Sequence, residues 1–155
     1  MSNQTPTINN YYRTAAWLIA CGKHPSTANL SVQIGCHLEE LVEFLECLET
    51  DCAEDTVSLE CIADEMRLIA SSLKKNITKA AIKDGKRVDA LDALCDSEVT
   101  GNGIAYLAGM DKPAADAAVL ASNEAKLVNG RPVLLPGGKI GKPDGWTPPD
   151  LRGFV

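Results

Sequence analysis

Apolar residues recur every three or four positions through most of the chain, which is the spacing of helices with one buried face. Frequent Ala and Leu and a low aromatic content favour helices over a β-sandwich or barrel. The pattern predicts an all-α fold, an antiparallel bundle of four to five helices in a single domain. The predicted helices cover residues 9–21, 28–50, 55–78, 87–108 and 111–126.

The two ends of the chain depart from this pattern. Residues 1–8 are polar and are expected to form a loose arm, whereas residues 9–127 form the bundle. Residues 128–155 are dense in Gly and Pro, which disfavours a further helix and predicts a hairpin or an extended tail. Within this tail, residues 133–135 could form a short strand.

The second and third predicted helices each carry an apolar stripe. The expected core positions of the second helix are Leu38, Leu41, Val42, Leu45 and Leu48. Those of the third helix are Val57, Ile62, Met66, Ile69 and Leu73. Ser26 or Thr27 is expected to cap the second helix, because a side-chain oxygen there can accept a free backbone N–H.

A row of glutamates occupies a different sector of the second helix. Glu39, Glu40 and Glu43 are neighbours on a helix, because residues three and four positions apart share one face. Such a row is either solvated surface, which is the common case for charged runs, or a place where a cation binds. His37 precedes this row and is either a ligand neighbour or, more commonly for a lone histidine, a hydrogen-bonding residue.

A second acidic row favours the cation interpretation. Asp89, Asp92 and Asp96 fall on one face of the fourth helix, whereas Leu91 and Leu94 point elsewhere. Asp is unfavourable inside helices because its side chain competes for backbone hydrogen bonds. Two such faces turned toward each other would offer only carboxylate oxygens, which suit Mg²⁺ or Mn²⁺ rather than zinc.

Charge and cysteine content restrict the partners and the location. The net charge of −6 argues against a surface that binds duplex nucleic acid. The six cysteines form no C-x-x-C pair and are expected to be reduced thiols, which predicts a cytoplasmic protein. No apolar run is long enough for a membrane span.

Two other motifs fail on inspection. The GGK at residues 137–139 lacks the Ser or Thr and the first Gly of a phosphate-binding loop. A carboxylate-bridged di-iron bundle needs Glu-x-x-His on two helices, and the chain has no such pair.

The carboxylate rows resemble those of the all-α nucleoside triphosphate pyrophosphatases, which include MazG, the dimeric dUTPases and the phosphoribosyl-ATP pyrophosphohydrolase HisE. The family pattern is E-E-x-x-E followed by E-x-x-D, and here Asp89 stands where Glu is usual, one methylene shorter. The resemblance covers about residues 30–155 and is closest to phage-type MazG-like or HisE-like proteins. Further matching residues are Leu94, Cys95, Asp96, Ser122, Asn123, Lys126, Gly138, Lys139, Lys142, Pro149, Asp150 and Leu151.

The resemblance implies hydrolysis of a (d)NTP between its α and β phosphates, with NMP and pyrophosphate as products. The implied cofactor is Mg²⁺, or Mn²⁺, and the implied ligands are Glu39, Glu40, Glu43, Asp89, Asp92 and Asp96. Glu39 or Glu43 would orient or deprotonate the attacking water. Asn123, Lys126, Lys139 and Lys142 would bind the phosphates. The family also implies a homo-oligomer, either a dimer or a tetramer, in a bacterial cell or a phage-infected host.

Two alternatives stay open at this point. The chain could be a phosphoribosyl-ATP pyrophosphohydrolase, or a non-catalytic helical module that binds a nucleotide or oligomerises. Tyr11, Tyr12 and Trp17 are expected in the core, with stacking on a nucleobase as the less common role.

Overall fold

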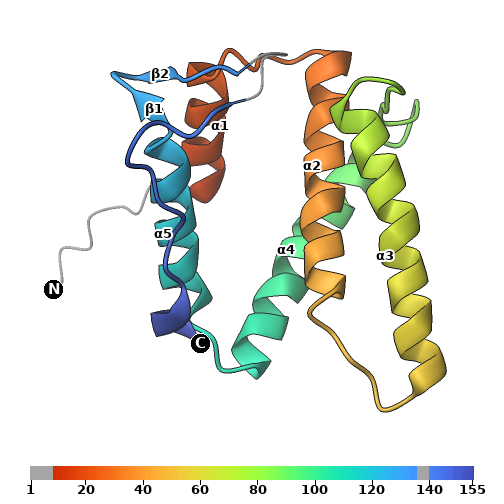
Figure 1. Cartoon of the computed structure of the whole chain (residues 1–155). Coiled ribbons are helices and arrows are strands. Elements are labelled where there is room, and N and C mark those ends of the chain that lie inside the picture. The colour runs from red at the N-terminus through yellow and green to blue at the C-terminus, as the bar shows by residue number, and fades with distance from the viewer. Residues whose placement is uncertain (1–8, 136–139) are drawn as a thin grey trace, which may run out of the picture. The chain divides into compact units, whose positions relative to one another are not determined.

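The computed structural model describes residues 9–135 and 140–155, and within these ranges it contains five α-helices (Figure 1). The helices are α1 (Asn10–Ala20), α2 (Thr27–Leu45), α3 (Ala53–Lys74), α4 (Arg87–Leu107) and α5 (Lys112–Glu124). The predicted all-α class is therefore confirmed. The expected arm at residues 1–8 lies outside the described residues.

The chain divides into two compact units, which are described separately. One unit spans residues 25–87 and contains α2 and α3. The other combines the N-terminal segment up to residue 24 with residues 88–155, and contains α1, α4, α5 and the C-terminal segment. Among the described residues, no helix is long and apolar enough to cross a membrane.

In the first unit, α2 and α3 run antiparallel and pack closely along their length (Figure 1). Their interface is made of small residues. Gly35, Ala63 and Ala70 are buried, together with Val42 and Leu73. Small side chains bring the two helix backbones together, and this close approach decides which polar side chains meet at the edges of the interface.

The stripes predicted for these helices are only partly correct. Val42 and Leu73 are buried as expected, but Leu41 and Leu48 are about 40% exposed. On α3 the predicted face is rotated, because Ala63 and Ala70 face α2 whereas Val57, Ile62 and Ile69 are at least half exposed. The small residues dominate here because only they permit the short distance between helices.

Local signals explain where these helices begin and end. The Ser26 hydroxyl accepts the Asn29 N–H at 3.1 Å and so caps α2 as predicted. The helix ends at Leu45 rather than near residue 50, since Cys47 and Leu48 donate to carbonyls three residues back. Helix α3 also ends early, because Asn76 takes a left-handed backbone conformation (φ 53°) that stops the helix.

In the second unit, α1 and α5 pack together and the C-terminal segment follows α5 (Figure 1). The Asp111 side chain caps α5, and Pro113 lies in its first turn. After α5 the chain forms a small antiparallel hairpin of β1 (Leu127–Val128) and β2 (Arg131–Pro132). A hairpin was expected, but both of its strands precede residues 133–135, where a short strand was predicted. Leu134 makes an isolated bridge with Ile140.

The chain end returns to the start of α5. A short 3-10 helix, η1 (Arg152–Phe154), packs on α5, and the Asp111 N–H donates to the Phe154 carbonyl at 2.8 Å. The C-terminal segment therefore runs back along the helix that precedes it.

Candidate functional site

The glutamate row lies on α2, beside the edge of its interface with α3. Glu39 forms an ion pair with Lys74 of α3, and its side chain is 44% exposed. Gly35, one turn earlier, makes this pairing possible: a Cβ there would lie 2.8 Å from the Ala70 carbonyl oxygen and 3.0 Å from the Lys74 backbone nitrogen. The close approach at Gly35 thus brings a lysine to the first carboxylate of the row.

Glu40 has an altered acidity. Its pKa is raised by partial desolvation and then by the charges of Glu43 and Glu39, while Lys74 and His37 act in the opposite direction. Glu43 and Glu39 therefore act electrostatically on Glu40. A divalent cation would relieve this repulsion, because an opposite charge favours the ionised form.

His37 is exposed on α2, and its charge lowers the pKa of Glu40 as the weakest of five influences. It is a neighbour of the glutamate row; whether it takes part in metal binding stays a prediction.

The aspartate row lies on α4, in the other unit. Asp89 is in the first turn of the helix, where a negative charge is favourable because the helix dipole is positive there. Asp89, Asp92 and Asp96 are all exposed, and so are Leu91 and Leu94, at 63% and 57%. The aspartates therefore lie on a helix with little buried surface.

Metal coordination by these rows is not visible as a preformed cluster. Within residues 9–135 and 140–155, no group of three or more His, Cys, Asp or Glu side chains is gathered as in a metal site. The donor chemistry nevertheless fits a hard cation, because both rows offer only carboxylate oxygens. Coordination of Mg²⁺ or Mn²⁺ by the six acids stays a prediction.

The predicted phosphate-binding residues lie in the unit that contains α5. The Lys126 ammonium donates to the Asn123 amide oxygen at 2.8 Å, so these two residues are brought together. Lys142 lies in the C-terminal segment, and its ammonium group is 4.6 Å from the ring centre of Trp146. Lys139 lies outside the described residues.

An ion pair fixes the helix that carries Asn123. Arg13 of α1 donates from Nε and Nη2 to the two carboxylate oxygens of Glu124, each at 2.9 Å. This hydrogen bonding lowers the pKa of Glu124. Because Glu124 follows Asn123 directly, the pair ties α1 to the end of α5 that carries the amide.

Sequence reasoning missed Lys74, Arg13 and Trp146. The Lys74 and Arg13 pairs depend on how two helices are aligned, which a single sequence does not reveal. Trp146 had a signal, since it is a lone aromatic residue in a Gly/Pro-rich segment between matched lysines and the P-D-L motif.

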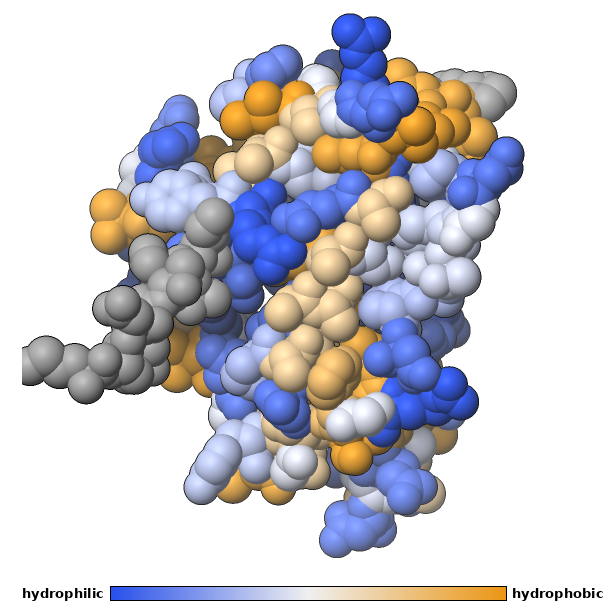
Figure 2. All heavy atoms as spheres, turned by 90° about the vertical axis from the view of Figure 1, so that its left-hand side faces the viewer, coloured by the Kyte–Doolittle hydropathy of each residue, from blue (hydrophilic) through white to orange (hydrophobic). Residues whose placement is uncertain are grey.

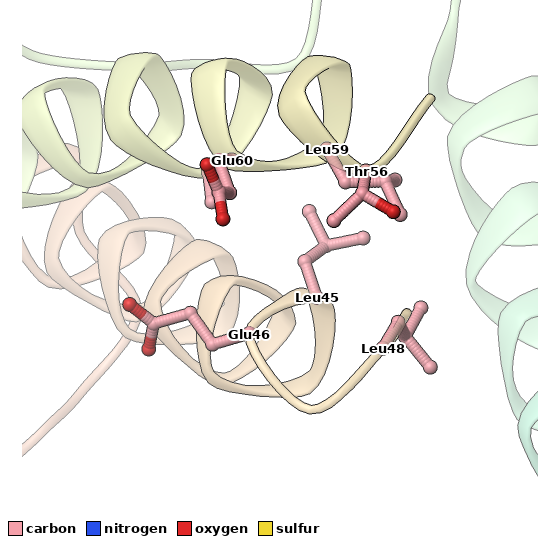
Figure 3. A pocket seen from close by; sticks show the side chains of 7 residues that line it. Leu45, Glu46, Leu48, Thr56, Leu59 and Glu60 are labelled. Atoms are coloured by element: carbon pink, nitrogen blue, oxygen red, sulfur yellow. The ribbon is translucent and has the colours of Figure 1, made fainter. Parts of the chain in front are cut away.

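A pocket of about 240 Å³ lies between the end of α2 and the start of α3 (Figure 3). Leu45, Leu48 and Leu59 contribute its apolar wall, and Glu46 and Glu60 lie at one side. Glu46 is paired with Arg67, so its charge is already compensated. The pocket is small, and none of the predicted site residues lines it.

All six cysteines are free thiols. Burial raises the pKa of the Cys21 thiol, while the charges of Lys23 and Lys126 lower it.

Comparisons with protein-family models, with curated proteins and with solved structures found no match to this chain.

Proposed function

We propose that the chain is a Mg²⁺-dependent nucleoside triphosphate pyrophosphatase, which hydrolyses a (d)NTP to a (d)NMP and pyrophosphate. The observation that carries the proposal is the E-E-x-x-E row on α2, where partial desolvation and then the charges of Glu43 and Glu39 raise the pKa of Glu40. Mutual repulsion within a row of three carboxylates is the electrostatic condition in which a divalent cation binds favourably. The resemblance of the carboxylate rows to those of the all-α pyrophosphatases supports the proposal.

In this mechanism Glu39, Glu40 and Glu43 would hold the cation, and Asp89, Asp92 and Asp96 would supply further oxygens. Bound Mg²⁺ would supply charge neutralisation at the phosphates and a lower pKa for a bound water. Glu43, or Glu39 once it is released from Lys74, orients the attacking water and accepts its proton.

The water oxygen attacks the α-phosphorus while the bond from that phosphorus to the bridging oxygen breaks. Pyrophosphate leaves with the electron pair of that bond. Lys126 and Lys142 donate hydrogen bonds to the phosphate oxygens, and Asn123 holds Lys126 in place through its amide oxygen. Such fixed positive charges lower the barrier because negative charge accumulates on these oxygens.

Self-association is part of the proposal. Large apolar side chains reach the surface on both units, and Figure 2 shows hydrophobic groups among hydrophilic ones on one face of the molecule. On α3 and α4, the exposed apolar residues include Leu68, Val88, Leu91 and Val99. A second copy of the chain could bury these exposed side chains, so we expect a dimer or tetramer in sedimentation velocity.

The test of the proposed chemistry is the Glu43→Gln variant. It keeps the side-chain size, removes one negative charge and should reduce turnover by at least about 100-fold, a typical effect of losing a general base. Glu98→Gln on α4 is the matched control, because it removes an exposed charge outside both rows and should turn over normally. Full activity of Glu43→Gln would remove the proposal for this residue.

A further inference from the structure

Trp146 is held in one orientation by α5. Its indole N–H donates to the Ser122 carbonyl at 2.9 Å, and the Ser122 hydroxyl lies 3.5 Å from the Thr147 carbonyl oxygen. The ring is half-buried. These contacts fix the edge of the indole against the end of α5, beside Asn123.

Two ammonium groups lie over this one ring. Lys126 Nζ is 5.2 Å and Lys142 Nζ is 4.6 Å from the ring centre. Both distances are within the range in which the negative face of an aromatic ring attracts a cation. Since both nitrogens lie that close to one point, they are at most about 10 Å apart.

The two lysines come from different segments. Lys126 follows α5, whereas Lys142 lies in the C-terminal segment beyond the hairpin. The two positive charges repel each other, and the indole holds them near each other against that repulsion. An anion that contacts both ammonium groups would relieve the repulsion.

Two lysines held at one ring suit a ligand with several anionic oxygens on adjacent phosphorus atoms. Lysine binds such a group as a point charge with three donors.

We propose that Trp146 is a positioning residue that holds Lys126 and Lys142 together as one anchor for a pyrophosphate group. In the proposed reaction this group is the β- and γ-phosphates, which leave as pyrophosphate. The assignment of the nucleotide rests on the proposed function, but binding of free pyrophosphate does not require turnover. The aromatic ring thus acts on the phosphates through the two lysines.

The chain allows a direct optical test. It contains two tryptophans, so the Trp17→Phe variant of the full chain leaves Trp146 as the only one. Titration with inorganic pyrophosphate in the absence of metal should give a saturable change in Trp146 fluorescence, because the ammonium groups shift from the ring toward the anion. Adenosine, which has a base but no phosphate, should give no change.

Two substitutions separate the ring from its hydrogen bond. Trp146→Leu removes both, and the pyrophosphate affinity, measured by calorimetry, should fall by about tenfold, the upper part of what a cation–π contact contributes. Trp146→Phe keeps a ring but loses the N–H, and the loss should be about threefold or less. Lys142→Met should weaken binding at least as much as Trp146→Leu. Circular dichroism of each variant reports whether the helices are kept.

Three outcomes would overturn the inference. Equal losses in Trp146→Phe and Trp146→Leu would mean that Trp146 only holds the tail in place. Unchanged pyrophosphate affinity in Trp146→Leu would mean that the ring has no part in binding. A fluorescence response to adenosine instead of pyrophosphate would make the ring a platform for a base.

These outcomes are distinct from failure of the proposed function. If the chain turns over a nucleotide and its pyrophosphate affinity does not depend on Trp146, only this inference is wrong. Pyrophosphate binding that depends on Trp146, without turnover of any nucleotide, removes the proposed function alone. If both are right, Trp146→Leu should raise the KM for the nucleotide more than it lowers kcat, and Trp146→Phe should restore most of the loss.

Discussion

Helices α2 and α4 each carry a row of carboxylates, yet they differ in how the row is supported. Helix α2 packs tightly on α3, and its row includes an ion pair with Lys74. From residue 88 to 100, every residue of α4 except Ala90 is exposed. The comparison shows that a carboxylate face can be built on a tightly packed interface of small residues or on a helix whose apolar residues still face outward.

The largest difference in stability is expected between truncation of a leucine on α3 and truncation of a leucine on α4. Leu73 is buried at 5% exposure, so Leu73→Ala should lower the free energy of unfolding by about 2–4 kcal/mol through lost burial and a cavity. Leu91 on α4 is 63% exposed, so within a single chain Leu91→Ala should change the free energy of unfolding by less than about 0.5 kcal/mol. Urea denaturation followed by circular dichroism measures both.

A large effect of Leu91→Ala would mean that the outward face of α4 is covered. Sedimentation velocity of the same variant then shows whether a second copy covers it, because loss of that contact would lower the oligomeric state.

Glycine-to-alanine substitutions on α2 and on α4 should also differ in their effect on stability. Gly35→Ala places a Cβ 2.8 Å from the backbone oxygen of Ala70, so α2 and α3 must separate, at about 1–3 kcal/mol of stability. Gly103→Ala on α4 meets no atom within 4 Å and should be neutral or stabilising by up to about 1 kcal/mol, since Ala favours a helix. Thermal melting of the two variants measures this contrast. Equal melting temperatures would contradict the tight α2–α3 interface.

A smaller, pH-dependent effect is expected at Glu40. Its pKa is raised in the folded chain, so folding favours the protonated form, and its contribution to stability is lost as the pH rises through the folded pKa. Glu40→Gln should therefore raise the melting temperature at neutral pH in the absence of metal, with a smaller gain at low pH.

Divalent metal should reverse the order of the melting temperatures of the parent and Glu40→Gln. If the row binds Mg²⁺ or Mn²⁺, saturating metal should raise the melting temperature of the parent more than that of Glu40→Gln. An identical increase in both would contradict metal binding by this row.

The sequence predicted the five helices well because their signals are local. The Ser26 and Asp111 caps and the periodic apolar positions depend on neighbouring residues. The predicted face of α3 was only partly correct, because large apolar side chains were given more weight than Ala63 and Ala70. The partners of Glu39 and Trp146 could not be predicted, since they depend on the alignment of separate elements. The acidic rows were visible as patterns, whereas their use as metal ligands stays a prediction.

The most direct test of the account is to incubate the purified chain with a panel of NTPs, dNTPs and phosphoribosyl-ATP, with and without Mg²⁺ or Mn²⁺, and to resolve the products by chromatography. We expect metal-dependent formation of a nucleoside monophosphate, or of phosphoribosyl-AMP, together with pyrophosphate. This activity should be lost in both Glu43→Gln and Asp92→Asn. Absence of turnover on every nucleotide, by a folded protein at saturating metal, would contradict the account.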